Sequence, residues 1–295
     1  MAGPYPLTNY GNTCYFNSLL QAVRASPVFV KYAQRMVRPA VGNRSKSELS
    51  RAFMALLERP SNRKLKAILE LLDSGTTLRM SEQHDVHDLY LVILDALLEC
   101  SPNKSWVDVV LGVELTAETK CVECGHASRV PAKSPYFRVD IADSFDTTVK
   151  PKIEYMTAQG ARYRCSFCRV QQPARRLETI TDIPRMLVVQ LMRLRFDGAK
   201  NFDTVSIPED FLLEPYLRFP WILRSVILHA GDRSQGHYVA LVKVGNQWWL
   251  TNDEELNKVS VAELDLYLGE SQTNTELSQM LCPYLLFYER EDQVS

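Results

Sequence analysis

The hydrophobic pattern of this chain changes its period near Pro102, and this change limits the possible folds more than any other feature. Before it, apolar residues recur every three or four positions, as in helices that bury one face. Helices are predicted over 16–36, with a boundary at Pro27, and over 47–58, 63–73 and 82–99. After it, alternating or β-branched runs predict strands over 107–119, 136–141, 177–194, 222–230, 237–250 and 284–289. Helices followed by strands indicate an α+β fold rather than alternating α/β units.

Composition places the chain among ordinary globular proteins. Its 295 residues are 46% hydrophobic and 23% charged, and its net charge of -1 gives no indication of nucleic-acid binding or of a polybasic membrane anchor. The start lacks a basic stretch followed by an apolar run, and the apolar run over 91–98 is far shorter than the roughly 20 residues that span a bilayer. We therefore expect a cytoplasmic protein, also present in the nucleus, without membrane insertion.

Four of the seven cysteines form two C-x-x-C pairs. An odd number of cysteines without a secretory signal argues against a disulfide framework. The pairs Cys121/Cys124 and Cys165/Cys168 each have the form of a metal knuckle, and two knuckles complete the tetrahedral shell of four thiolates that zinc favours. The alternatives are surface thiols or a redox pair, but neither pair follows a strand and opens a helix. One structural zinc is predicted, and no organic cofactor.

Cys14 has unusual neighbours for a single cysteine. A polar turn that contains Gly11 runs directly into an amphipathic helix, so the thiol lies at the positive end of the helix dipole, which favours thiolate. Asn9 could direct its amide at a developing oxyanion beside a backbone N–H. The competing interpretation is a buried cysteine that acts only as a small hydrophobe. We predict an activated thiol rather than a buried one.

A candidate base for this thiol occurs far along the chain. A glycine-containing loop delivers His237 at the start of a predicted strand, where a histidine is partly exposed. Asn252 or Asp253 could accept a hydrogen bond from its far nitrogen and so fix the tautomer. A structural histidine that is hydrogen-bonded elsewhere remains the alternative.

These segments together resemble the ubiquitin-specific protease family of cysteine proteases. NYGNTCYFNSLLQAV resembles its cysteine box, and GHYVALVKV with WWLTNDEEL and PYLLFYER resembles its histidine box. QHDVHDLYLVILDAL is similar to its glutamine–aspartate helix, and the two cysteine pairs are similar to its zinc-bearing fingers. The resemblance spans nearly the whole chain, with the boxes in family order.

The resemblance implies one catalytic domain over 1–295 with a papain-like fold. Its thumb would cover about 1–105, its fingers about 106–180 with a zinc ribbon, and its palm about 181–295. Cys14 would be the nucleophile, His237 the base, Asn252 the orienting residue with Asp253 beside it, and Asn9 the oxyanion residue. The residues that would grip the modifier's C-terminal tail are Gln83, Asp85, Asp88, Gly236 and Tyr238.

Two departures from the family pattern concern the third catalytic residue. Only 15 positions separate His237 from Asn252, which implies a short hairpin, and Thr251 stands where an aromatic residue usually precedes the acid pair. Asn252 and Asp253 are expected in one extended segment, with their side chains on opposite faces, so that only one can contact the histidine.

Within the family, the stretches HDVHDLYLVI, VVQLMR and SQGHYVALVK are most like those of the interferon-induced member. This implies an isopeptidase that removes the interferon-stimulated ubiquitin-like modifier from target proteins and restrains interferon signalling. The alternatives are a general deconjugase of ubiquitin, or a scaffold that binds a modifier or an interferon receptor complex without cleaving anything. Retention of Cys14, His237, Asn252 and Asn9 together favours the enzyme, because a scaffold needs none of them.

Overall fold

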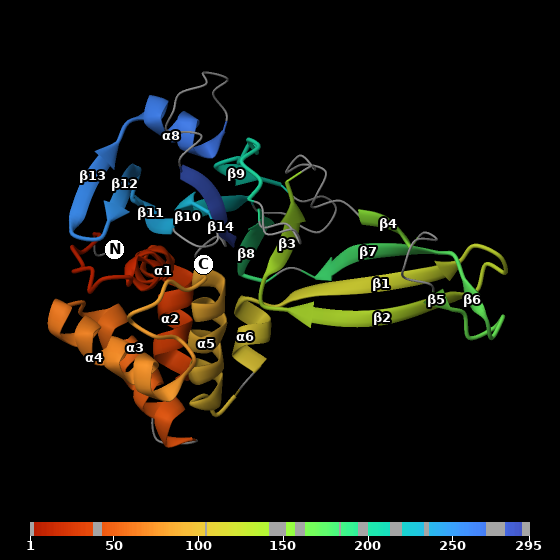
Figure 1. Ribbon diagram of the computed structural model, residues 1–295, viewed down its shortest axis with the longest axis horizontal. Coiled ribbons are helices and arrows are strands. Elements are labelled where there is room, and N and C mark those ends of the chain that lie inside the picture. The colour runs from red at the N-terminus through yellow and green to blue at the C-terminus, as the bar shows by residue number, and fades with distance from the viewer. Residues whose placement is uncertain are drawn as a thin grey trace.

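In this computed structural model the chain forms a helical layer, a large sheet packed against it, and a narrow second sheet that projects to one side (Figure 1). The residues that the structure describes are 3–37, 43–103, 105–141, 152–156, 163–182, 184–193, 200–212, 220–232, 236–269 and 281–290. No helix among them is long and apolar enough to cross a membrane.

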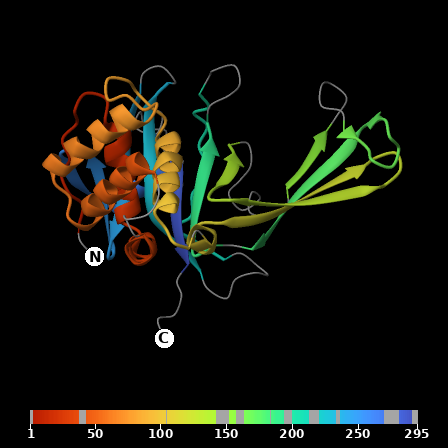
Figure 2. The ribbon, with the colours of Figure 1, turned by 90° about the horizontal axis from the view of Figure 1, so that it is seen from below.

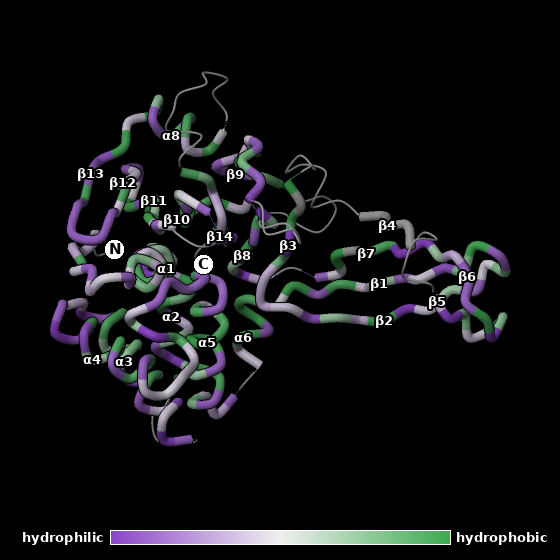
Figure 3. The backbone as a smooth tube through the Cα atoms, viewed as in Figure 1, coloured by the Kyte–Doolittle hydropathy of each residue, from purple (hydrophilic) through white to green (hydrophobic). Residues whose placement is uncertain are grey.

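The helical layer comes from the first part of the chain. Side-chain caps begin several of its helices: for example, Ser26 accepts from the backbone N–H of Phe29, and Ser61 accepts from that of Lys64. Apolar side chains of the helices form one core with those of sheet residues such as Ile227 and Phe287. Figure 3 shows hydrophobic and hydrophilic residues interspersed along the helices. The helices are α1 (Cys14–Arg24), α2 (Pro27–Met36), α3 (Arg44–Glu58), α4 (Asn62–Gly75), α5 (Val86–Glu99) and α6 (Ser105–Val110).

The large sheet has the strand order β13-β12-β11-β10-β14-β8-β3, with β9 (Asp210–Phe211) paired to β10. Its neighbours are antiparallel except for β3 and β8, which are parallel. The face turned away from the helices packs a second core, which α8 (Val261–Leu268) joins. The strands are β3 (Phe137–Asp140), β8 (Met186–Met192), β10 (Trp221–Gly231), β11 (Gly236–Val244), β12 (Gln247–Asn252), β13 (Glu255–Val259) and β14 (Leu281–Arg290).

The projecting sheet has the order β2-β1-β7-β4 and is long and thin (Figure 2). Its strands are β1 (Val113–Cys121), β2 (Ala127–Ser134), β4 (Lys152–Met156) and β7 (Ala174–Asp182). Most of β2 is exposed, so apolar packing supplies little stability here. The short hairpin of β5 (Tyr163–Arg164) and β6 (Gln171–Gln172) lies at the far end.

Several predicted boundaries differ from the structure. The strand expected over 107–119 begins only at Val113, because Trp106, Val107 and Val110 pack at helical spacing in α6. The helix expected from residue 82 begins at Val86, because the Asp85 side chain caps it. The run 177–194 is split between two sheets, and the run 237–250 is split by a turn at 245–246. The strand β3 lies inside the predicted fingers, yet it pairs with β8 of the large sheet.

Candidate active site

Cys14 is the first residue of α1 and follows a turn that only glycine adopts without strain. Gly11 has φ +109°, in the region that L side chains avoid, and the next turn is fixed because Asn9 Oδ1 accepts from the backbone N–H of Thr13 at 3.1 Å. The expectation that the thiol is not buried is wrong, since Cys14 is only 4% exposed. What distinguishes it from an inert buried thiol is its hydrogen bond to His237.

His237, at the start of β11, connects Cys14 to Asn252. Its Nε2 donates to Asn252 Oδ1 at 2.6 Å, which leaves Nδ1 for Cys14. The hydrogen bond with Cys14, and after it the one with Asn252, raises the pKa of His237 to about 9 against the opposing effect of burial. A protonated imidazole beside the thiol is the arrangement that stabilises a thiolate.

The register of the β11–β12 hairpin explains why Asn252 reaches the histidine. Val244 pairs with Gln247 across a two-residue turn, and Ala240 pairs with Thr251. His237 and Asn252 therefore lie diagonally on one face, and a slip of one residue would turn Asn252 away. Thr251 is buried and donates its hydroxyl to the carbonyl of Ala240 at 3.1 Å, which an aromatic residue could not do. The predicted short hairpin is confirmed.

Asp253 is not in an extended segment, contrary to expectation, but in the turn that follows β12, with φ +53°. Its carboxylate accepts from Asn9 Nδ2 and from Asn17 Nδ2, each at 2.8 Å. It therefore ties the loop before Cys14 and the first turn of α1 to the hairpin that bears Asn252. Because Asn9 is bound in this way, its role at the oxyanion stays a prediction. Asn17 was missed by the sequence reasoning, although a polar residue on the buried face of a helix was a usable signal.

Two of the predicted tail-binding residues, Gln83 and Gly236, contact each other directly. Gln83 Nε2 donates to the Gly236 carbonyl at 2.9 Å, and the Gly236 N–H donates to Gln83 Oε1 at 2.8 Å. This reciprocal pair fixes the backbone next to His237 against the loop before α5.

The other three predicted tail-binding residues differ in their hydrogen bonds and in their exposure to solvent. Asp85 accepts from the His87 N–H at 2.8 Å and from the Tyr284 hydroxyl at 2.6 Å, and burial raises the pKa of its carboxyl. Tyr238 is partly buried and packs against the helical core, whereas Asp88 is exposed. Asp88 is thus the carboxylate most open to a cationic tail residue, and binding of the tail by all five stays a prediction.

The four knuckle cysteines converge at the far end of the projecting sheet. Their sulfur atoms all lie within 4.8 Å of one another, with Cys121 and Cys168 at 4.0 Å and Cys124 and Cys165 at 3.6 Å. A tetrahedral site with Zn–S bonds of about 2.3 Å needs sulfurs about 3.8 Å apart, so the donor set fits zinc. Zinc held there would join the tips of the β1–β2 and β5–β6 hairpins, where apolar packing is sparse.

We predict about one zinc per chain, bound by these four thiolates. Cys165→Ser should lower the zinc content measured by elemental analysis and make the projecting sheet more sensitive to limited proteolysis, because no apolar core among the described residues replaces the metal there. Cys100→Ser, which removes a thiol from the helical core, should leave the zinc content unchanged. Metal-free protein with a protease-resistant projecting sheet would contradict the prediction.

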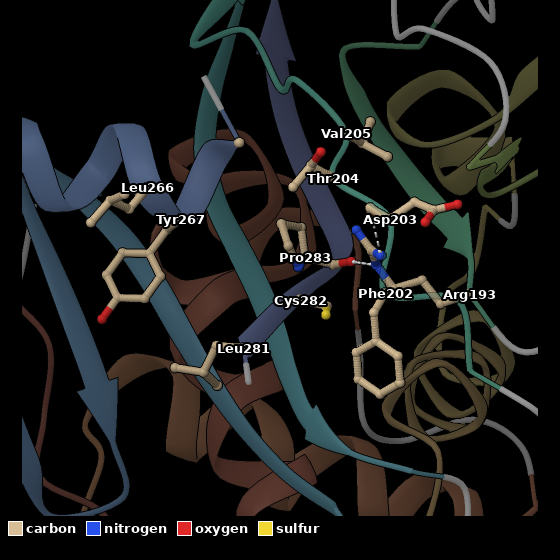
Figure 4. Close-up of a pocket in the computed structure, with 11 residues that line it drawn as sticks. Arg193, Phe202, Asp203, Thr204, Val205, Leu266, Tyr267, Leu281, Cys282 and Pro283 are labelled. Carbon is tan, nitrogen blue, oxygen red and sulfur yellow. Dashed lines mark hydrogen bonds between the residues drawn. The ribbon is translucent and has the colours of Figure 1, made fainter. Parts of the chain in front are cut away.

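A small pocket lies between the end of α8, residues 202–205 and the start of β14 (Figure 4). None of Cys14, His237 and Asn252 lines it. Arg193 lines this pocket and donates from Nε to the carbonyl of Pro283 at 2.6 Å. The pocket is therefore separate from the thiol–imidazole pair.

Comparisons with known proteins agree with this geometry. Residues 5–288 match the family described as "UCH: Ubiquitin carboxyl-terminal hydrolase". The chain is 28% identical to the probable ubiquitin carboxyl-terminal hydrolase 16 of Schizosaccharomyces pombe, over 98% of this chain and 67% of that protein. It is 25% identical to the human ubiquitin carboxyl-terminal hydrolase 17-like protein 12, over 96% of this chain and 55% of that protein. The chain thus spans only about half to two thirds of these relatives.

A solved structure shares the fold. It is described as the SAGA Ubp8/Sgf11/Sus1/Sgf73 DUB module bound to ubiquitin aldehyde. Its matching chain superposes with a TM-score of 0.76 at 20% identity, over 98% of this chain and 70% of the other.

Proposed function

Because the chain belongs to the ubiquitin carboxyl-terminal hydrolase family, we propose that it is a thiol isopeptidase that releases a ubiquitin-like modifier from its target proteins. The observation that carries this proposal is the chain of contacts from Cys14 through His237 to Asn252. The names of the related hydrolases and the ubiquitin aldehyde in the similar structure support ubiquitin as one modifier that it binds.

In the proposed reaction the Cys14 thiolate attacks the carbonyl carbon of the modifier's last glycine. The imidazolium of His237 gives its proton to the departing amine, and the C–N bond breaks to leave a thioester. His237 then takes a proton from water, whose oxygen attacks the thioester and releases the modifier as a carboxylic acid and Cys14 as the leaving group. Asn252 keeps the imidazole in one orientation throughout, and Asn9 with backbone N–H groups would bind the oxyanion.

The interferon-stimulated modifier is the substrate that we propose for this site in the cell. The support is the resemblance of segments around residues 84–93, 188–193 and 234–243 to the interferon-induced member of the family. Restraint of interferon signalling, contact with an interferon receptor complex, and action in the cytoplasm and nucleus belong to the same proposal. Since ubiquitin and this modifier share an Arg-Gly-Gly tail, the choice between them must be made where the projecting and large sheets meet the modifier's folded body.

A side-by-side cleavage assay tests this choice. We expect kcat/KM for a fluorogenic derivative of the interferon-stimulated modifier to exceed that for the same derivative of ubiquitin by about a hundredfold, or about 2.7 kcal/mol of differential transition-state binding. A peptide that carries only the shared tail serves as the control, because it lacks the body that is recognised. Equal values would remove the substrate preference but leave the isopeptidase intact, whereas no turnover of either modifier would favour the scaffold.

A further inference from the structure

His229 of β10 lies beside the active site but has no part in the mechanism above. It pairs directly with Tyr238 of β11, and the two rings are 4.5 Å apart. Directly paired residues share one face of a sheet. The ring of Tyr284, whose hydroxyl reaches Asp85, is 6.4 Å from that of His229. His229 therefore lies on the face that looks toward the loop before α5.

Lys200 determines which nitrogen of His229 has the proton. Lys200 Nζ lies 3.0 Å from His229 Nδ1 and 2.8 Å from each of the carbonyl oxygens of His229 and Gly231. Three acceptors around one nitrogen use all three N–H bonds of an ammonium group, so Nδ1 must accept and the proton must be on Nε2. Burial, and after it the charge of Lys200, lowers the pKa of His229 to about 4, which keeps the ring neutral near pH 7.

Lys200 is itself held in place by a buried arginine. Arg193, which is 1% exposed, donates from Nη1 to the carbonyls of Asn201 and Asp203 at 3.0 Å each. The same side chain donates from Nε to the carbonyl of Pro283 in β14 (Figure 4). These bonds fasten the segment that follows Lys200 to the large sheet and so fix the position of the Lys200 ammonium group.

The protonated edge of His229 lies over Gly236, next to the catalytic histidine. A Cβ atom built on Gly236 would come within 2.1 Å of His229 Nε2, so only glycine leaves room for this edge. Both backbone polar groups of Gly236 are already bonded to Gln83. His229 Nε2 donates no hydrogen bond to any residue in the described part of the chain, where the ring is bonded only through Nδ1. The side chain of His229 thus offers a fixed N–H donor beside Gly236, the residue that precedes His237.

We propose that His229 is a further substrate-binding residue whose Nε2–H donates to a backbone carbonyl of the modifier's C-terminal tail, and that Lys200 is the positioning residue that fixes this donor. The inference rests on the proposed function, since an extended tail must pass Gly236 for its last carbonyl to reach Cys14. Such a tail has unpaired backbone carbonyls, which need donors when they leave water.

An NMR spectrum of the enzyme without substrate tests whether Lys200 fixes the tautomer of His229. In enzyme labelled with ¹⁵N-histidine, long-range ¹H–¹⁵N correlations distinguish the two neutral tautomers, and His229→Phe assigns the signal among the five histidines. We expect the Nε2–H pattern for His229 in the natural protein and a mixture of tautomers in Lys200→Met. The Nδ1–H pattern in the natural protein would overturn the inference.

Kinetics test the binding step. Lys200→Met and His229→Phe should each raise KM for a fluorogenic modifier derivative about tenfold with kcat nearly unchanged, because the lost bond holds the tail in both ground and transition states. The double variant should be no worse than either single one, since both remove the same bond, and Lys200→Arg should recover part of the affinity. Lys243→Met is the matched control: this lysine is also partly buried on the large sheet, but it pairs with Glu209.

The outcomes separate this inference from the proposed function. If the natural enzyme is active and neither Lys200→Met nor Lys243→Met changes its KM, the binding role of His229 is overturned but the proposed function is not. A natural enzyme that hydrolyses neither modifier overturns the proposed function and the binding role together.

Discussion

Replacement of Cys14 by alanine should reduce hydrolysis of a modifier–fluorophore fusion by about 10⁴-fold or more, because no other group can form the thioester. Binding of the modifier should be nearly unchanged. The thiol is 4% exposed at the start of α1, so the smaller side chain leaves the surface that meets the modifier as it is. Turnover measures the first effect, and the Kd for the intact modifier measures the second.

Cys100→Ala is the appropriate control for Cys14→Ala. Cys100 is also buried, but it contacts the hydroxyl of Ser47 in the helical core and has no histidine partner recorded among the described residues. Its loss should cost stability without loss of activity. A modifier that ends in an electrophile should label the natural protein and Cys100→Ala, but not Cys14→Ala. Substantial turnover by Cys14→Ala would show that the mechanism is wrong.

Sequence reasoning predicted those parts of the fold that depend on the pattern of neighbouring residues in the chain. Hydrophobic period and Pro27 were enough to find α1 and α2, because each helix buries one face. The convergence of the C-x-x-C pairs followed from the geometry that metal knuckles share. Membership of the ubiquitin-specific protease family is confirmed by the match over residues 5–288, whereas the interferon-induced specialisation stays a prediction.

The parts that were missed depend on contacts between distant segments. The strand predicted over 136–141 is β3, but nothing local indicates its sheet, because it joins the large sheet only through its parallel pairing with β8. The left-handed turn at Asp253 is stabilised by Asn9 and Asn17, which lie more than 230 positions away in the chain. Lys200 looks like an ordinary surface lysine until the fold brings it to His229. At the active site, sequence therefore indicated the reacting groups and Asn252, which orients the histidine, but not the contacts of Asp253 and Lys200.

Loss of the Asn252 side chain should lower kcat about a hundredfold with little change in KM, within the usual range for general-base catalysis. Its Oδ1 is the acceptor, at 2.6 Å, that keeps Nδ1 of His237 directed at Cys14. That hydrogen bond also contributes to the raised pKa of His237, about 9. In Asn252→Ala the imidazolium should lose its proton at a lower pH, so the alkaline limb of the kcat profile should move to lower pH.

Asn252→Asp and Asp253→Ala separate orientation of the histidine from support of the loop. Asn252→Asp keeps an acceptor at the same place, so it should retain substantial activity. Asp253→Ala removes the carboxylate that accepts from the amides of Asn9 and Asn17 but does not touch the bond to His237, so it should lower stability and move the alkaline limb less. The assignment of Asn252 is falsified if Asp253→Ala is the more damaging change in kcat while Asn252→Ala is nearly silent. That result would require the Asp253 carboxylate to leave the amides of Asn9 and Asn17 and to replace Asn252 at His237.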